Sequence, residues 1–301
     1  MASIRIAFLI LAHRNAHQIE RLCLRLRPHN VFVHVDAQAA DFPTNQLAEL
    51  PGVTVVSPRR AVHWGDFSMV EATLTLLSAA RAVGSFDRYV LLSGECYPAK
   101  PITALEEAFE TNPQREWISL TPISASSHLT IMTGRHWRMA PLVGAHGLDM
   151  KLRSAWNKAS KLFGRDLRRE IGTTPYFGSQ WFGLSARCVG MIQKFVPAHP
   201  EFVRAYWSVY APDEHFFQTI IGNSEFGACA IHMEDRGIAT NQSPPLHHIA
   251  PSEDRYFGNN ERDFDLVVRT GKFFLRKVSP QRSGPLLDRI DRELLGRSSP
   301  Y

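Results

Sequence analysis

The sequence has few cysteines, and their spacing excludes the small domains that depend on disulfides or structural zinc. The four cysteines are widely separated and include no Cys-x-x-Cys pair; they are Cys23, Cys96, Cys188 and Cys229. Disulfide frameworks and zinc knuckles need cysteines that are paired or closely spaced. Their absence favours a reducing compartment, so we expect a cytoplasmic protein.

Long hydrophobic runs are also missing. The apolar run near the N-terminus extends only from Ile6 to Ala12, and no small-x-small cleavage site follows it, which indicates a buried strand and not a signal peptide. No stretch approaches the ~20 apolar residues that a membrane span requires. We therefore expect a protein that is soluble or peripheral to a membrane.

Three motifs that present phosphates or a nucleophile are absent as well. No GxGxxG follows the first predicted strand, and neither GxxxxGK[ST] nor GxSxG occurs. Dehydrogenases, P-loop enzymes and α/β-hydrolases therefore lose support. The net charge of +5 favours anionic ligands without requiring nucleic acid, and we predict no nucleic-acid partner.

The first hundred residues alternate strand and helix patterns. Four apolar strands are predicted at residues 4–11, 31–36, 53–58 and 88–93. Two helices with apolar residues at three-and-four spacing are predicted between them, at residues 16–27 and 68–84. Ser68 and Glu71 are predicted to form a capping box at the start of the second helix, and Gly84 ends it. This alternation predicts a doubly wound α/β fold, with a mostly parallel central sheet flanked by helices.

The remaining two thirds of the chain have weaker patterns. Residues 115–178 predict irregular segments plus one helix, and residues 181–185 predict another strand. A helix is predicted from Pro212 to Ile221, with proline in its first turn. We divide the chain into one α/β domain, residues 1–280, and a C-terminal amphipathic helix and tail, residues 281–301. The apolar face of that helix is expected to cover the domain or, as the alternative, to contact a membrane surface.

Ligands in open α/β sheets bind beyond the carboxyl ends of the strands. Polar residues follow three predicted strands there: His13-Arg14, His34 with Asp36, and the Ser93–Cys96 segment. His13 and His17 have the i, i+4 spacing of metal ligands, but we interpret them as a hydrogen-bonded structural pair. Asp263-Phe264-Asp265 is an Asp-x-Asp motif far from the sheet edge, which predicts a solvated turn and no metal site.

Seven segments in order carry a resemblance to a known family: IAFLILAHRN, VFVHVD, HWGDFSMVEA, YVLLSGECYP, GSQWFGLS, PDEHFFQTI and KFFLRKV. Together, over about residues 4–280, they resemble the core-2/I-branching N-acetylglucosaminyltransferases and peptide O-xylosyltransferases, as a compact bacterial member. The resemblance implies a GT-A-like fold and an inverting transfer from a UDP-sugar donor to a glycan acceptor, with a β-linkage. It also implies that neither a metal ion nor another cofactor is needed.

The same resemblance implies roles for individual residues. Glu214, in the Pro-Asp-Glu element, matches the catalytic base, and Arg276 and Lys277 match the basic pair that holds the donor diphosphate. The residues implied to contact the nucleoside are His13, His34 and Asp36, and those implied to contact the sugars are Ser179, Gln180 and Trp181. Other substrate contacts are implied for Asp213, Glu95 and the acceptor-loop residues Arg135 and Arg138. Arg255 is an implied phosphate contact. Cys96 departs from the family, which usually has aspartate two positions after Ser-Gly.

The chemistry of these residue types fits such a transfer. A carboxylate can take the proton of an attacking sugar hydroxyl, and a fixed arginine and lysine can stabilise charge on a leaving diphosphate. The expected role is the transfer of N-acetylglucosamine or xylose during cell-surface polysaccharide assembly. The alternatives are a nucleotide-sugar hydrolase, a transferase with another donor, and a non-catalytic glycan-binding protein on a degenerate transferase fold. The oligomeric state is left open.

Overall fold

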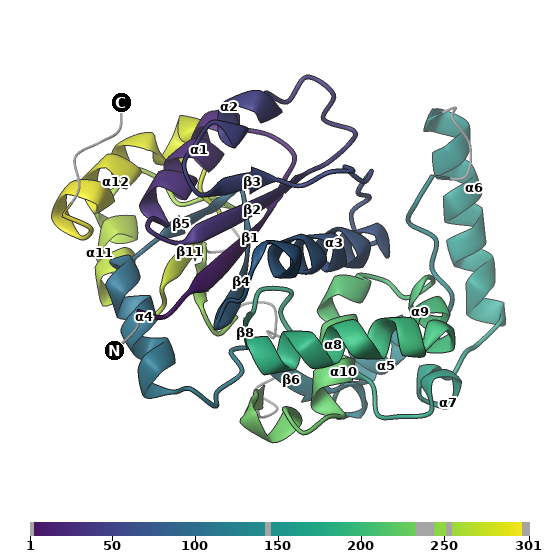
Figure 1. Cartoon of the computed structure of the whole chain (residues 1–301). Coiled ribbons are helices and arrows are strands. Elements are labelled where there is room, and N and C mark those ends of the chain that lie inside the picture. Colours follow the sequence, from purple (N-terminus) through teal and green to yellow (C-terminus); the bar gives the residue numbers. More distant parts are fainter. Residues whose placement is uncertain (1–2, 142–145, 233–243, 251–254, 297–301) are drawn as a thin grey trace.

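The computed structural model describes residues 3–141, 146–232, 244–250 and 255–296. A five-stranded sheet, in the order β3-β2-β1-β4-β8, forms its centre (Figure 1). All neighbouring pairs are parallel except β4 and β8, which are antiparallel. The strand bounds are β1 Ile6–Ala12, β2 Asn30–Val35, β3 Val53–Val55, β4 Arg88–Ser93 and β8 Gly183–Ser185. These strands confirm the predicted doubly wound α/β fold.

Helices cover both faces of this sheet, and β1 shows why. Ala7 and Leu9 are buried in a core shared with α3 (Ser68–Val83), whereas Phe8 and Ile10 are buried in a second core shared with α1 (Ala16–Arg25). Because successive side chains of a strand point to opposite faces, a strand covered on both sides is apolar throughout. This explains the unbroken apolar run from which the strand was predicted.

Two smaller sheets extend the molecule. In one, β11 (Phe274–Arg276) lies between β10 (His247–Ile249) and β5 (Cys96–Pro98). The other has the order β7-β6-β9, with β6 Ser119–Pro122, β7 Tyr176–Phe177 and β9 Ile231–His232. The antiparallel pairing of β11 with β5 places the end of β11 beside the loop that follows β4.

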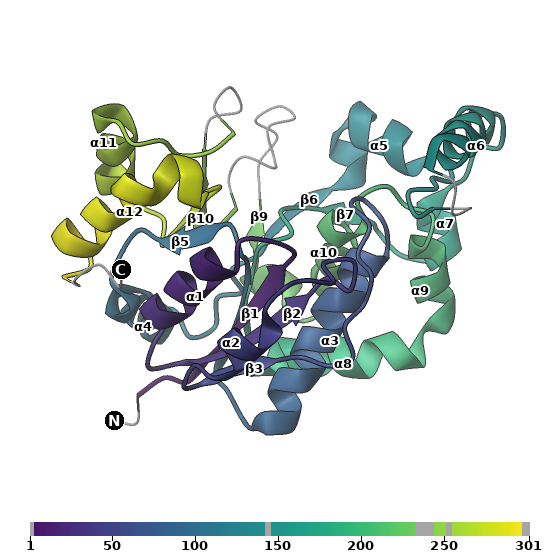
Figure 2. The ribbon, with the colours of Figure 1, turned by 90° about the horizontal axis from the view of Figure 1, so that it is seen from above.

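The remaining helices surround these sheets (Figure 2). The α-helices are α2 Thr44–Ala48, α4 Ile102–Thr111, α5 Ser127–Thr133, α6 His146–Ala159, α7 Leu167–Ile171, α8 Ala186–Ala198, α9 Pro200–Tyr206, α10 Phe216–Gly222, α11 Glu261–Arg269 and α12 Pro280–Glu293. Four 3-10 helices are η1 Ile123–Ala125, η2 Ser160–Leu162, η3 Pro212–Glu214 and η4 Gly227–Cys229. Among the described residues of 115–178 there are three α-helices and two strands, so the prediction of one helix there is wrong.

Two further local predictions are wrong. Ser68 does not cap α3: its Oγ accepts a hydrogen bond from the amide of His63, and Asp66 accepts the hydrogen bond of the Ser68 amide. The predicted helix from Pro212 to Ile221 is broken at His215 into η3 and α10. The break separates the Pro-Asp-Glu element from the buried α10 and presents it as a short turn of its own.

The C-terminal helix α12 packs on the domain. Its apolar residues Leu286, Leu287 and Ile290 are buried in a third core, together with Tyr97 of β5 and Leu275 of β11. The packing alternative is therefore confirmed, and this apolar face is not exposed to a membrane. The helix begins at Pro280, one residue before the predicted start of the C-terminal segment at residue 281.

A buried charge cluster fixes α12 to the body of the protein. The Asp291 carboxylate accepts hydrogen bonds from Arg21, Arg25 and the Tyr97 hydroxyl, at 2.6–2.7 Å.

No helix in the described part of the chain is long and apolar enough to cross a membrane.

Candidate active site

A cavity of about 650 Å³ opens at the carboxyl ends of β1, β2 and β4. It collects residues that are far apart in the sequence. Nearly all the predicted site residues line it, namely His13, His34, Asp36, Glu95, Gln180, Trp181, Asp213, Glu214, Arg276 and Lys277. The sequence prediction that the strand ends form one site is thus met in the geometry, although roles within the site stay proposals.

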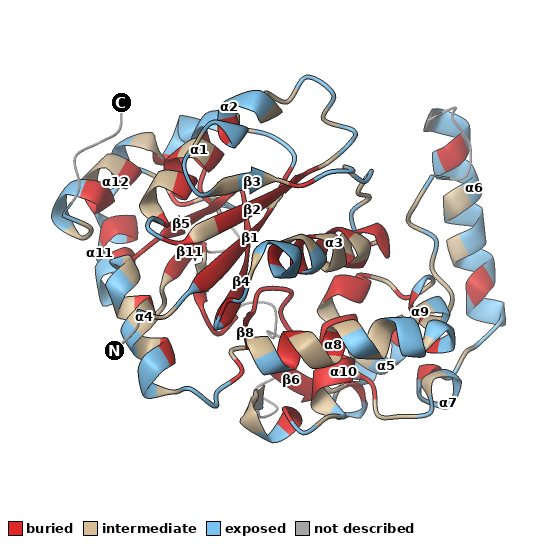
Figure 3. Cartoon of the chain, viewed as in Figure 1, coloured by how far each residue is buried: buried red, intermediate tan, exposed pale blue. Residues whose placement is uncertain are grey.

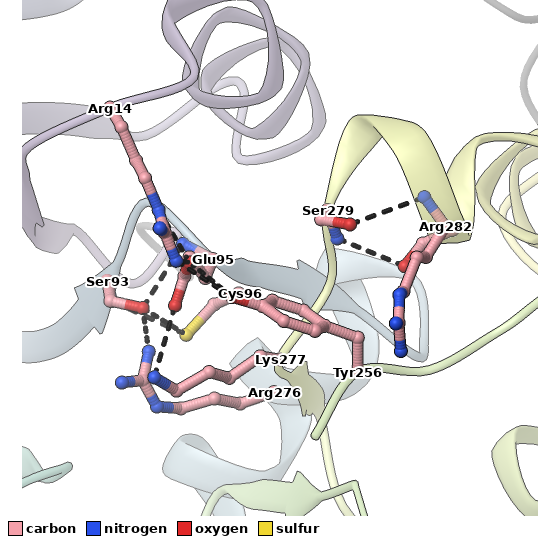
Figure 4. A network of polar contacts seen from close by, with 10 residues as sticks. Arg14, Ser93, Glu95, Cys96, Tyr256, Arg276, Lys277, Ser279 and Arg282 are labelled. Atoms are coloured by element: carbon pink, nitrogen blue, oxygen red, sulfur yellow. Dashed lines mark hydrogen bonds and ion pairs between the residues drawn. The ribbon is translucent and has the colours of Figure 1, made fainter. Parts of the chain in front are cut away.

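Glu95 is the centre of a polar network on one wall of this cavity (Figure 4). Its carboxylate accepts a hydrogen bond from Arg14 Nε at 3.0 Å and lies 3.3 Å from Lys277 Nζ. The Tyr256 hydroxyl, which accepts a hydrogen bond from Arg14, also contacts Glu95. Burial opposes ionisation of Glu95, but Arg14, Lys277 and Arg276 outweigh it and lower its pKa. Glu95 is therefore a permanent negative charge within a cluster of cations.

The cluster has a surplus of positive charge. Arg276 donates a hydrogen bond to the Ser93 hydroxyl, and its guanidinium lies 4.3 Å from the centre of the Trp181 ring. Burial and the neighbouring Arg276 lower the pKa of Lys277, while Glu95 opposes this shift. Arg14 and Lys277 thus form ion pairs with one buried carboxylate, and Arg276 adds a third positive charge beside them. Such an excess of fixed donors suits a dianionic group such as a diphosphate.

Cys96 does not line the cavity. It is fully buried in β5, and its Sγ accepts a hydrogen bond from the Ser93 amide at 3.3 Å. Cys96, which occupies the position of the expected aspartate, therefore stabilises the turn at Ser93 through this hydrogen bond. Glu95, one position earlier, contacts the cations. The acidic group on this wall comes from Glu95.

Glu214 and Asp213 also line the cavity, and both belong to η3. Glu214 is half-buried, and the Gly178 amide donates a hydrogen bond to its carbonyl oxygen at 2.9 Å. A Cβ at Gly178 would lie 1.9 Å from the Ser119 carbonyl oxygen, so only glycine allows this close approach. The Gly-Ser-Gln-Trp segment thus holds the Pro-Asp-Glu element in place.

Two buried polar atoms in the cavity wall lack hydrogen-bond partners among the described residues. They are Oδ1 of Asp213 and Nε2 of Gln180. Burial raises the pKa of Asp213 above its ordinary value. An unpartnered buried polar atom costs about 1–3 kcal/mol. An acceptor and a donor left in this state are suited to the hydroxyl and amide groups of a sugar.

Ser179, Arg135 and Arg138 are the predicted site residues that do not line the cavity. Ser179 is buried behind it, where its hydroxyl accepts from the Trp181 amide and its carbonyl accepts from Gln218. Arg138 is exposed, and its backbone is hydrogen-bonded to the Asn157 side chain. The Arg135 guanidinium lies over the Trp137 ring, 3.6 Å from its centre. The structure therefore gives Ser179 a positioning contact and places Arg138 outside the cavity.

His34 and Asp36 form the wall below the end of β2, with His13 beside them. His34 Nε2 accepts a hydrogen bond from the Arg60 amide at 3.0 Å, and burial lowers the His34 pKa, which favours the neutral ring. Asp36 accepts hydrogen bonds from the amides of Gln38 and Val62. These contacts with backbone amides fix the positions of the His34 ring and the Asp36 carboxylate in the cavity wall.

Several lining residues were missed from the sequence. Arg14 was seen only as part of a polar strand end, although its pairing with Glu95 joins residues 81 positions apart. Trp64 is 69% exposed at the cavity, and its ring contacts Tyr210, which also contacts Trp137. Only the position of Trp64 next to Gly65 in the HWGDFSMVEA segment could have drawn attention to it.

Arg255, an expected phosphate contact, also lines the cavity.

The acidic and histidine motifs outside the cavity have structural partners. Asp263 is not in a solvated turn: it is buried at the start of α11, where its carboxylate accepts the Gly258 amide hydrogen bond. His17 lies 3.7 Å from Glu20 on α1. Within the described ranges, no three His, Cys, Asp or Glu side chains are grouped so that they could hold a metal ion.

The model of one protein family, described as Core-2/I-Branching enzyme, matches residues 6–253. The chain belongs to the core-2/I-branching enzyme family. It is therefore a glycosyltransferase, for which a sugar donor and a glycan acceptor are the implied partners. Membership and the central sheet flanked by helices together confirm the GT-A-like fold class.

Solved structures similar to this core-2/I-branching enzyme are distant. Mouse xyloside xylosyltransferase 1, in its apo form, is 12% identical, with 90% of this chain and 97% of that chain covered and a TM-score of 0.37. A putative glucose-1-phosphate thymidylyltransferase from Bacillus anthracis is 10% identical, with coverages of 76% and 86% and a TM-score of 0.35. No curated protein matches the chain significantly.

Proposed function

We propose that this family member is an inverting, metal-independent glycosyltransferase. It moves N-acetylglucosamine or xylose from a UDP-sugar to a glycan hydroxyl and forms a β-linkage, during assembly of cell-surface polysaccharide. One observation carries the proposal: a single cavity joins an excess of cations around Glu95 to the unpartnered polar atoms of Gln180 and Asp213. Cations for a diphosphate and hydrogen-bonding groups for a sugar are the two requirements of a nucleotide-sugar donor.

In the proposed reaction, Glu214 accepts the proton of the acceptor hydroxyl as its oxygen attacks the anomeric carbon. The bond from that carbon to the β-phosphate oxygen breaks, and the electron pair stays on UDP. Arg276 and Lys277 stabilise the charge that develops there. Trp181 stacks on Arg276 and limits the directions in which its guanidinium can turn. Trp64, exposed at the cavity, offers an apolar ring for the face of an acceptor sugar.

The proposal is tested by incubating the full chain with UDP-N-acetylglucosamine, UDP-xylose and other nucleotide sugars. We expect UDP release that depends on a glycan acceptor and persists in excess EDTA, because the arginine and lysine supply the positive charge. Release without acceptor would favour the hydrolase alternative. Activity that is lost in EDTA and restored by Mn²⁺ would contradict metal independence.

Replacing Lys277 with alanine is expected to weaken UDP binding by about 10- to 100-fold, because a hydrogen bond to a charged group contributes ~1.5–3 kcal/mol. Turnover should fall as well, since charge on the leaving phosphate increases in the transition state. Calorimetric titration with UDP measures the first effect. Lys194→Ala, which removes an exposed lysine of α8 outside the cavity, is the matched control. Unchanged affinity in Lys277→Ala would place the diphosphate elsewhere.

A further inference from the structure

Helix α6 exposes its apolar side chains to solvent, whereas an ordinary surface helix buries them against the protein. Three of its polar residues, Asp149, Arg153 and Asn157, contact the protein. Asp149 is buried and paired with Arg153, which also donates to the Met139 carbonyl oxygen at 2.7 Å. Asn157 exchanges two hydrogen bonds with the backbone of Arg138. Surface helices of soluble proteins normally bury their apolar face.

The apolar residues of this helix point to solvent. Leu148, Leu152 and Trp156 follow one another at intervals of four, which places them on one stripe, and they are 54%, 41% and 51% exposed. Directly after the helix, Leu162 and Phe163 are 83% and 68% exposed. Figures 1 and 3 show α6 at the margin of the molecule, remote from α11 and α12. We call these five residues, with Lys151, Lys158 and Lys161, the α6 surface.

The exposed charges of the α6 surface all have one sign. The three lysines are exposed, and the one carboxylate within His146–Phe163, that of Asp149, is buried in its pair with Arg153. A second copy of the chain would bring the same lysines against these, which is unfavourable. An anionic bilayer accepts both features, since tryptophan, leucine and phenylalanine enter the acyl boundary while lysines contact the headgroups.

We propose that the α6 surface docks this protein on a membrane that contains anionic lipids. The docking site is connected to the cavity through aromatic contacts. The segment that anchors α6 contains Trp137, whose ring contacts Tyr210, and Tyr210 contacts Trp64 at the cavity. A docked enzyme would therefore hold its acceptor side next to the bilayer. The proposal goes beyond the sugar transfer and does not depend on the identity of the donor.

The test is co-sedimentation of the full chain with vesicles, without any nucleotide sugar. We expect binding to vesicles of phosphatidylcholine with phosphatidylglycerol, little binding to phosphatidylcholine alone, and a decrease at high salt. Trp156→Ser should weaken binding by about tenfold. Lys151→Glu with Lys158→Glu should weaken it by at least about 25-fold, at about fivefold for each lysine.

Two matched controls separate docking from general effects. Trp207→Ser removes an equally exposed tryptophan at the end of α9, and Lys194→Glu reverses a charge on α8; both should bind vesicles like the unaltered chain. Circular dichroism and transfer to a soluble acceptor should be unchanged in Trp156→Ser. Absence of vesicle binding, or equal losses in the controls, would overturn the proposal. So would a dimer in light scattering that Trp156→Ser dissociates, since that would assign the surface to a second copy.

Discussion

Replacing Glu214 with glutamine is expected to lower sugar transfer by about 10²- to 10⁴-fold, the usual contribution of a general base. Glutamine preserves the size of the side chain and a hydrogen bond, but it cannot take a proton from the acceptor hydroxyl. UDP affinity should stay unchanged, because the cations proposed to hold the diphosphate are those around Glu95. Turnover and calorimetric UDP affinity, measured on the same preparation, separate the two effects.

Glu225→Gln is the matched control for this change. Glu225 is exposed, paired with Arg187 at 2.9 Å and outside the cavity, so the variant should transfer sugar at the normal rate. If Glu214→Gln also transfers within about threefold of the unaltered enzyme, Glu214 is not the base, since general-base loss is far larger. If no sugar transfer is found in any form of the protein that binds UDP, the glycan-binding alternative gains support.

Replacing Asp291 with alanine is expected to lower the free energy of unfolding by about 3–5 kcal/mol, because it removes the one buried carboxylate that pairs with both Arg21 and Arg25. Asp291 is 0% exposed, whereas Asp288 on the same helix is an exposed partner of Arg21. Asp288→Ala should therefore cost less than about 1 kcal/mol. Urea unfolding measures both values. Similar small losses in the two variants would contradict the assignment of α12 docking to the buried cluster.

The pH dependence of unfolding provides an independent check on Asp291. Burial raises its pKa, but hydrogen bonds from Arg25, Tyr97 and Arg21 outweigh this and lower it below the ordinary 3.8. As the pH falls below that ordinary value, the unfolded chain binds the proton first, so stability is lost with acid. The contribution is fully present above the ordinary value. Asp291→Ala should reduce the slope of stability against pH in the acid range.

The sequence predicted the parts of the fold in which local pattern and burial agree. Strands β1, β2 and β4 are apolar on both faces because helices cover both, and their carboxyl ends converge as expected. The one helix predicted within residues 115–178 had no bounds, and α6 could not be located there because its buried face is polar and its apolar stripe is exposed. The capping box failed because Asp66, two residues earlier, accepts the amide hydrogen bond of Ser68.

The sequence predicted which residues line the candidate site better than it predicted the contacts between them. The sequence segments that resemble the family indicated Glu214, Arg276 and Lys277. No local pattern, however, shows that Arg14 and Lys277 both pair with the Glu95 carboxylate. The displacement of Ser179 from the cavity also depends on tertiary contacts, with Ser119 and Gln218. Long-range pairing of charges is decided by packing, which a single sequence does not reveal.

The Glu95 carboxylate has a consequence for the turnover cycle. Because it already neutralises part of the charge on Arg14 and Lys277, arrival of the diphosphate of the proposed donor would be an exchange of partners and not the capture of an anion by bare cations. The exchange reduces the electrostatic part of the affinity for donor and for UDP alike. UDP carries one more negative charge than the donor once the sugar has left, so bare cations would hold it more tightly than the substrate. Under the proposed function, the return of Lys277 to Glu95 would ease the release of UDP and restore the ion pairs for the next donor.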